Sequence, residues 1–261
     1  MTDTNVIIGR DVIIHPSAQL LAKELVIGDF SKIGKDVIIS GGRVEIGREA
    51  WITTDVLIGG GRAEMGSLQT GDFLHLGQGS MVNTANEVIM GDEVGIGMDG
   101  RVFSHGTYLS EYDGFPYQDA PVKIGSNVWM PYAIVNPGIT IGNNVVVAAM
   151  SLINRDLPSG CLAGGIPVKL IRENMYPRKI SQEEKIRVLD KIINEAQFYG
   201  IHAERDAEGT RIELEKTVFD VPSRKIEGLA NERTDIVKDL LRRHGIRFRF
   251  YNNGTEYSPW D

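Results

Sequence analysis

Aliphatic residues recur along the first two thirds of the chain at steps of six or seven positions. The first of them are Ile8, Ile14, Leu20, Ile27, Ile33, Ile39, Ile46, Ile52 and Ile58, and a glycine follows several of these. A fixed short period over a long stretch indicates a solenoid made of one repeated unit. A step of six matches neither the helical period nor simple strand alternation. The pattern therefore predicts very short strands, each placing one aliphatic side chain in a shared core.

The repeat runs from about residue 5 to about residue 173 and breaks once, for about twenty residues around His105. Three repeats would make one triangular turn, so the stretch would build roughly eight or nine turns that bury their aliphatic residues only by stacking. Strands of successive turns would pair in parallel. We expect a mainly β chain whose first domain, residues 1–173, is a parallel β-helix with an inserted loop.

Residues 174–205 change to a helical pattern. Ser181 and Glu184 have the spacing of a capping box. The apolar residues that follow at helical spacing on one face are Ile186, Leu189, Ile193 and Ala196. We predict an amphipathic connecting helix of about five turns that ends near Gly200 and caps the coil or packs against a partner subunit.

Residues 206–261 predict a small α/β unit. Residues 211–215 alternate as a half-buried strand does, and Thr234–His244 has a helical apolar face that ends before Gly245. Residues 246–251 alternate again and predict a second strand. A unit of about fifty residues is marginal alone, so it should dock on the coil or on another subunit. Trimer assembly, acceptor selection and partner docking all remain open as its role.

Charge and composition narrow the function classes. The formal net charge is −7 and the pI about 5.3, which argues against a general affinity for nucleic acid or anionic membranes. No stretch reaches the roughly twenty apolar residues that span a bilayer, and no secretory signal is visible at the N-terminus. The single cysteine, Cys161, excludes an internal disulfide. We expect a soluble cytoplasmic protein.

The break in the repeat is the expected site of chemistry. His105 stands at its edge, and an imidazole titrates near neutral pH, so it is a candidate general base. The loop after it, residues 108–117, is rich in aromatic side chains, which stack well on sugar rings and also pack well against other subunits. A rigid coil with one excursion offers what a binding or catalytic site needs.

The downstream residues carry a resemblance. The segment Pro121-Val122-Lys123-Ile124-Gly125, with Trp129 after it, leads to Pro137-Gly138, and a later segment reads Ala163-Gly164-Gly165-Ile166-Pro167. This order resembles the hexapeptide-repeat acyltransferases, the group of sugar and xenobiotic O- and N-acetyltransferases. The resemblance covers about residues 5–173 and is most specific from 121 to 172.

The resemblance implies a left-handed parallel β-helix, a homotrimer and acetyl-coenzyme A as acyl donor, with no metal. The acceptor would be a hydroxyl- or amine-bearing small molecule, with a sugar or amino sugar favoured. His105 matches the catalytic general base of the family. Asn83 matches an asparagine that contacts the acceptor, although Asn86 fits nearly as well. Glu111 and Asp113 are the nearest acids that could orient the imidazole.

The same comparison implies the coenzyme site. The groove would be lined by turns that include Trp129, Ala148, Ala149 and Ser151, and the phosphates would meet Arg155, Lys169 and Arg172. Where the family commonly has Trp-Ile-Gly, this chain has Trp129-Met130-Pro131, and the next repeat is one residue short. We expect this departure to reshape the groove locally.

Three alternatives compete. A non-catalytic scaffold could use the same coil, with the C-terminal unit binding a partner. A γ-type carbonic anhydrase needs three histidines on zinc, and His15, His75 and His105 lack the required close pair. A nucleotidyltransferase would need a nucleotide-binding domain before the repeats. His105 together with the stretch 148–172 favours the acyltransferase, because a scaffold has no reason to keep both.

Overall fold

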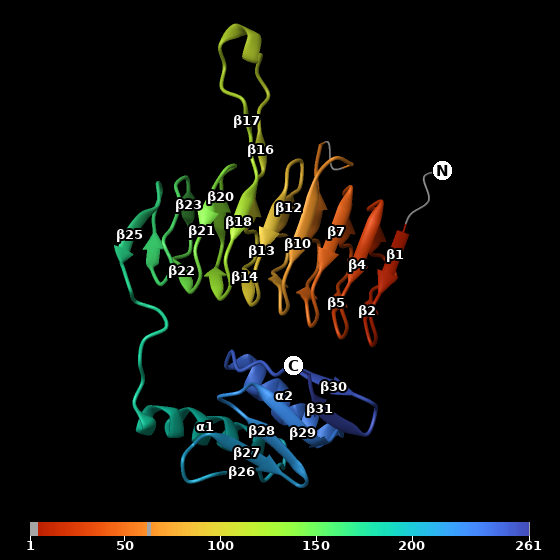
Figure 1. Cartoon of the computed structure of the whole chain (residues 1–261), viewed down its shortest axis with the longest axis vertical. Coiled ribbons are helices and arrows are strands. Elements are labelled where there is room, and N and C mark those ends of the chain that lie inside the picture. Colours follow the sequence, from red (N-terminus) through yellow and green to blue (C-terminus); the bar gives the residue numbers. More distant parts are fainter. Residues whose placement is uncertain (1–4, 62–63, 261) are drawn as a thin grey trace. The chain divides into compact units, whose positions relative to one another are not determined.

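The computed structural model describes residues 5–61 and 64–260, and the chain divides into two compact units at Pro177 and Arg178. The first unit is a coil whose strands form three sheets (Figure 1). Strands of successive turns pair in parallel, an arrangement typical of a left-handed β-helix. The predicted fold class is confirmed.

The strands of each sheet come from successive turns, except for the last strand of sheet B, which pairs antiparallel with the strand before it. Sheet A contains β1 (Asn5–Ile8), β4 (Glu24–Ile27), β7 (Arg43–Ile46), β10 (Ser67–Thr70), β13 (Val88–Met90), β18 (Val122–Ile124) and β21 (Thr140–Ile141). Sheet B contains β2 (Ile13–Ile14), β5 (Lys32–Ile33), β8 (Trp51–Ile52), β11 (His75–Leu76), β14 (Val94–Ile96), β19 (Val128–Met130), β22 (Val145–Val147), β24 (Leu162–Gly164) and β25 (Lys169–Arg172). Sheet C contains β3 (Gln19–Leu20), β6 (Ile38–Ile39), β9 (Leu57–Gly59), β12 (Met81–Asn83), β15 (Arg101–Val102), β20 (Ala133–Val135) and β23 (Ser151–Ile153).

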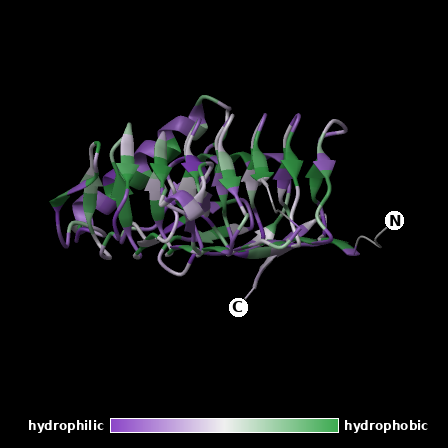
Figure 2. Ribbon diagram, turned by 90° about the horizontal axis from the view of Figure 1, so that it is seen from above, coloured by the Kyte–Doolittle hydropathy of each residue, from purple (hydrophilic) through white to green (hydrophobic). Residues whose placement is uncertain are grey.

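The repeated aliphatic side chains form the core of the coil, as predicted. From the second turn onward they are fully buried, among them Ile33, Ile58 and Val147. Ile8, in the first turn, is 39% exposed, because no turn stacks on that side of it among the described residues. Figure 2 shows the resulting distribution of hydropathy along the coil, with hydrophobic strands joined by more polar corners.

Polar side chains tie neighbouring turns together at the corners between sheets A and B. Asn143 Oδ1 accepts a 2.7 Å hydrogen bond from the backbone N–H of Ser126, and Ser159 Oγ accepts one of 3.0 Å from the N–H of Asn143. A β-carbon at Gly125 would lie 2.4 Å from Asn143 Oδ1. The glycine after the repeated aliphatic residue is thus needed for close approach of successive corners.

The second unit contains two helices and an antiparallel sheet. The helices are α1 (Gln182–Gln197) and α2 (Glu232–Arg243). The sheet contains β26 (Glu204–Arg205), β27 (Arg211–Leu214), β28 (Thr217–Asp220), β29 (Lys225–Leu229), β31 (Glu256–Pro259) and β30 (Phe250–Asn252), in that order. The capping box of Ser181 and Glu184 is present, and α1 packs within this unit, against α2.

The sequence predicts part of this unit correctly. β27 and α2 lie where the pattern places them, with Asn231 as the N-cap of α2. The strand predicted over 246–251 is regular only from Phe250, yet Ile246, Phe248 and Phe250 are buried as the alternation requires. Strands β28, β29 and β31 are additional elements of the sheet.

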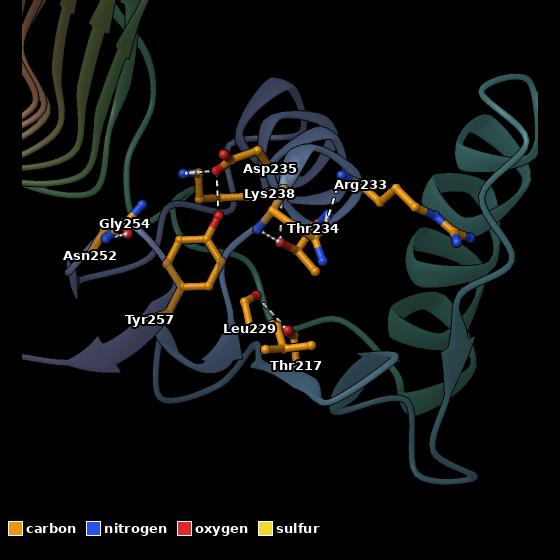
Figure 3. Close-up of polar contacts among 10 residues, drawn as sticks. Thr217, Leu229, Arg233, Thr234, Asp235, Lys238, Asn252, Gly254 and Tyr257 are labelled. Atoms are coloured by element: carbon orange, nitrogen blue, oxygen red, sulfur yellow. Dashed lines mark hydrogen bonds and ion pairs between the residues drawn. The ribbon is translucent and has the colours of Figure 1, made fainter.

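A polar cluster joins α2 to β31 (Figure 3). Tyr257 is 2% exposed, and its hydroxyl donates a hydrogen bond to Asp235 Oδ1. The same carboxylate oxygen lies 2.6 Å from Nζ of Lys238, whose ammonium group lies 4.5 Å from the ring centroid of Phe250. Burial is the main cause of the raised pKa of Tyr257, so this hydroxyl stays protonated and remains a donor.

Candidate active site

His105 lies at the base of a hairpin that leaves the coil directly after β15 (Figure 1). The hairpin is formed by β16 (His105–Gly106) and β17 (Gln118–Asp119), joined by a loop with a 3-10 turn over Glu111–Asp113. In the antiparallel register His105 is opposite Asp119. The imidazole is half-buried, so it is held by the fold while part of it remains accessible.

Ser104 fixes the backbone just before His105. Its side chain is fully buried, and Oγ lies 2.8 Å from the carbonyl oxygen of Asn83 and 3.1 Å from Asn83 Oδ1. The same Oγ accepts a 2.9 Å hydrogen bond from the N–H of Asn86. Asn83, at the end of β12, is thus bonded to Ser104, the residue that precedes His105 in the next turn.

A second set of contacts runs from the coil to the ring of His105. Asn86 Nδ2 donates a 2.8 Å hydrogen bond to Asp119 Oδ1, and the hydroxyl of Tyr117 donates one of 3.1 Å to Asp119 Oδ2. The rings of Tyr117 and His105 meet edge to face, with centroids 5.9 Å apart. Sequence reasoning included Tyr117 in the aromatic loop 108–117, but it did not place Tyr117 beside His105 and did not single out Asp119. The alternation of these two residues on the returning strand is the pattern that could have identified them.

Glu111 occupies a different place. It is exposed and begins the 3-10 turn at the far end of the loop, where its carbonyl oxygen accepts a hydrogen bond from Gly114. Tyr108 and Tyr112, also in this loop, are 97% and 99% exposed. Within the described residues of one chain, the structure therefore does not bring Glu111 to His105.

A hollow of about 320 Å³ lies over the outer side of sheet C near its last strands. Its lining residues are Asp99, Arg101, Tyr132, Ile134, Met150, Ser151, Leu152 and Ile166. The chain shortens here, because the corner between β19 and β20 is only Pro131 and Tyr132. Ile134 nevertheless keeps its register with Arg101 and Leu152. The missing residue is thus absorbed in the corner and the sheet is preserved.

The residues expected to bind coenzyme are spread over this end of the coil. Ser151 lines the hollow, and its buried hydroxyl donates to the carbonyl oxygen of Ala148 and accepts from the N–H of Gly165. Ala148 and Ala149 are exposed at the corner before β23. Trp129 is 43% exposed on the outer face of sheet B.

The expected phosphate-binding residues are all on the surface. Arg155 is exposed at a corner, and Lys169 and Arg172 are exposed on β25, the strand that closes sheet B. Arg101, which the sequence analysis did not single out, is the basic residue that lines the hollow. Arg101 is half-buried on β15, and His105 follows it four residues later in the chain.

Two other reactive side chains, those of Cys161 and His75, pack against other parts of the coil. Cys161 is fully buried in the core, and burial raises the pKa of its thiol. His75 packs against Trp51, with ring centroids 5.4 Å apart. The described residues include no group of three or more His, Cys, Asp or Glu side chains placed to hold a metal ion. None of the helices in the described part of the chain is long and apolar enough to cross a membrane.

Comparison with known proteins finds sequence likeness over part of the chain. No family model matches the chain. The galactoside O-acetyltransferase of Escherichia coli is 44% identical over 54 residues, which are 20% of this chain and 27% of that protein. The bifunctional protein GlmU of Heliobacterium modesticaldum is 27% identical over 198 residues, 67% of this chain and 41% of that protein. The chain thus matches less than half the length of either relative.

Among solved structures, a hexapeptide-repeat acetyltransferase from Vibrio cholerae in complex with acetyl-coenzyme A is similar at 22% sequence identity, with a TM-score of 0.37. The match covers 56% of this chain and 69% of that one.

Proposed function

We propose that this chain is a hexapeptide-repeat acetyltransferase that transfers an acyl group from acyl-coenzyme A to a small acceptor. We propose acetyl as the acyl group. The acceptor would carry a hydroxyl or amine, with a sugar or amino sugar favoured by the aromatic loop 108–117. The observation that carries the proposal is the position of His105, four residues after Arg101, which lines the hollow that also contains Ser151.

The chain geometry limits the separation of base and hollow. Four residues span at most about 14 Å when fully extended, so the α-carbon of His105 lies within that distance of the α-carbon of Arg101. The apolar walls at Ile134 and Ile166 suit the extended pantetheine arm of the donor. Polar groups at Arg101 and Ser151 would orient it. We propose Ala148 and Ala149, at the corner before β23, as further contacts along this groove, and Trp129 as a contact on the adjoining outer face of sheet B.

His105 would act as a general base in a complex of both substrates. Its neutral imidazole nitrogen takes the proton of the acceptor hydroxyl or amine, and the acceptor lone pair attacks the thioester carbonyl carbon. The carbonyl π electrons move to oxygen, which a backbone N–H would stabilise. The oxyanion lone pair re-forms the carbonyl as the C–S bond breaks, sulfur takes the bonding pair, and the proton passes from the imidazolium to the thiolate. No covalent enzyme intermediate forms, and the buried Cys161 takes no part.

Two further parts of the proposal concern assembly and the phosphates. We propose a homotrimer, which would cover exposed side chains of the loop such as Tyr108 and Tyr112. Arg155, Lys169 and Arg172 would meet the phosphates of the coenzyme, since all three are exposed cations near the last turns of the coil.

Calorimetric titration of the full chain with acetyl-coenzyme A tests the donor site. The proposal expects saturable binding at about one site per chain, weakened when Ile134→Asp puts a charge on the apolar wall of the hollow. Leu21→Asp, at an exposed residue of the first turns, is the matched control and should leave binding unchanged. Absence of binding by the wild type at millimolar donor would favour the alternative of a non-catalytic scaffold.

A further inference from the structure

A chain of side-chain contacts connects the body of the coil to the ring of His105. Asn86 lies at a corner of one turn, Asp119 and Tyr117 lie on the returning strand of the hairpin, and His105 lies on the leaving strand. The links are the two hydrogen bonds to the Asp119 carboxylate, of 2.8 and 3.1 Å, and the edge-to-face contact of the Tyr117 and His105 rings.

We propose that Asn86, Asp119 and Tyr117 are positioning residues that hold the imidazole of His105 in one orientation. This inference rests on the proposed function for its catalytic consequence, and on the geometry alone for the positioning itself. Asn86 acts through Asp119, Asp119 acts through Tyr117, and the Tyr117 ring contacts the imidazole.

The hairpin register explains why these residues meet. Side chains directly opposite each other in an antiparallel pair share one face, so His105 and Asp119 lie on the same side of the hairpin. Tyr117 is two residues from Asp119, and strand alternation gives it the same face. Gly106 and Gln118, the other pair, belong to the opposite face.

Asn86 anchors this set of contacts to the coil. The backbone N–H of Asn86 is bound to the buried Ser104, and its side-chain Oδ1 accepts from the N–H of Glu87. The amide of Asn86 is therefore fixed by the coil before it reaches Asp119. A carboxylate that accepts two hydrogen bonds from such partners holds Tyr117 more firmly than a neutral acceptor would. The ring of Tyr117 then limits rotation of the His105 side chain.

Exchange of the two hydrogen-bonding partners gives the sharpest test. Asn86→Asp places two carboxylates together, and Asp119→Asn leaves an amide that can accept only one of the two bonds. The double variant Asn86→Asp with Asp119→Asn restores an amide–carboxylate pair with the roles reversed. Its amide oxygen at 119 can still accept from Tyr117. Both single variants should therefore disturb His105, and the double variant should restore it.

The direct readout is the nuclear Overhauser effect between ring protons of His105 and Tyr117, measured on the full chain with labelled histidine. We expect it in the wild type and in the double exchange, and we expect it weakened in each single variant and in Tyr117→Phe. Tyr199→Phe, at an exposed tyrosine of the C-terminal unit, is the matched control. An unchanged effect in Asp119→Asn and Tyr117→Phe would overturn the proposal.

Kinetics supply the second readout. Misplacement of a catalytic group by about 1 Å can cost about 10²-fold, so kcat should fall by up to about that factor in the single variants. Acetyl-coenzyme A affinity should stay unchanged, and the exchange should recover kcat. If the wild type turns over no acceptor while the ring contact responds as expected, the proposed function fails and the positioning of His105 stands.

Discussion

The indole ring of Trp129 lies on the backbone of Gly95, its register partner in the preceding turn of sheet B. A β-carbon at residue 95 would come within 2.5 Å of Cε3 of Trp129, closer than side chains tolerate. Gly95 has an ordinary backbone conformation, so space for the indole is the reason for glycine here. The pair gives Trp129 its place on the outer face of the coil.

Replacement of Gly95 by alanine should therefore destabilise the coil by forcing the indole to move. Overpacking of this kind costs about 1–3 kcal/mol. The loss of stability caused by Gly95→Ala should be smaller in a Trp129→Ala background, since the clash is then absent. Chemical unfolding of the two single variants and the double variant measures this coupling. Equal losses from Gly95→Ala in both backgrounds would show that the indole is not the obstacle.

Replacement of Asn143 by alanine should weaken the connection between two turns. The backbone N–H of Ser126 would lose its 2.7 Å acceptor, which costs about 1 kcal/mol. Asn143→Asp keeps an oxygen in the same place and is the matched control. Thermal unfolding should place the aspartate variant near the wild type and the alanine variant below it.

Stability of the C-terminal unit should depend on the charge of Glu184. A hydrogen bond from the Arg178 guanidinium, followed by one from the backbone N–H of Ser181, holds the pKa of Glu184 at about 2. The ordinary value of a glutamate is about 4.3. Because the folded pKa is the lower one, the stabilisation is present above pH about 4.3 and is lost as pH falls through about 2.

The difference in melting temperature between the wild type and Glu184→Gln should accordingly be largest near neutral pH and shrink as the pH approaches 2. High salt should also reduce it, since the ion pair with Arg178 is exposed. Arg178→Gln should reproduce the effect. A difference that stays constant from pH 7 to pH about 2 would rule out the charge of Glu184 as its cause.

Removal of the Tyr257 hydroxyl should destabilise the C-terminal unit modestly. Tyr257→Phe keeps the buried ring and loses one hydrogen bond to Asp235, and bonds to charged groups contribute about 1.5–3 kcal/mol. Tyr257→Leu should cost more, because the ring also packs on Phe250, with centroids 5.3 Å apart. If urea unfolding showed the Tyr257→Leu variant to be more stable than the Tyr257→Phe variant, it would contradict a stabilising role for the ring.

The repeat made the coil predictable because each buried position recurs at a fixed step. His105 was found for the same reason, since it stands where that step fails. The partners of His105 were harder to find, because the return of the hairpin, and not sequence distance, decides which acid faces it. Glu111 is nearer in sequence but sits at the end of the loop, whereas Asp119 lies opposite His105.

The C-terminal unit shows a second limit of pattern reading. Alternation correctly predicted which side chains of residues 246–250 are buried, but backbone pairing there begins only near Phe250. The spacing of hydrophobic residues indicates which side chains of a strand are buried. The backbone hydrogen bonds of that strand depend on a neighbouring strand, which the local sequence does not reveal. The same reason explains why β28, β29 and β31 were not anticipated.

The most direct test of the central claim is thiol release from saturating acetyl-coenzyme A, measured with a panel of hydroxyl and amino sugars for the wild type and for His105→Ala. We predict release by the wild type with at least one acceptor, and a loss of about 10²–10⁴-fold in the variant with donor affinity retained. A His105→Ala variant that turns over as fast as the wild type would contradict the assignment of His105 as the general base.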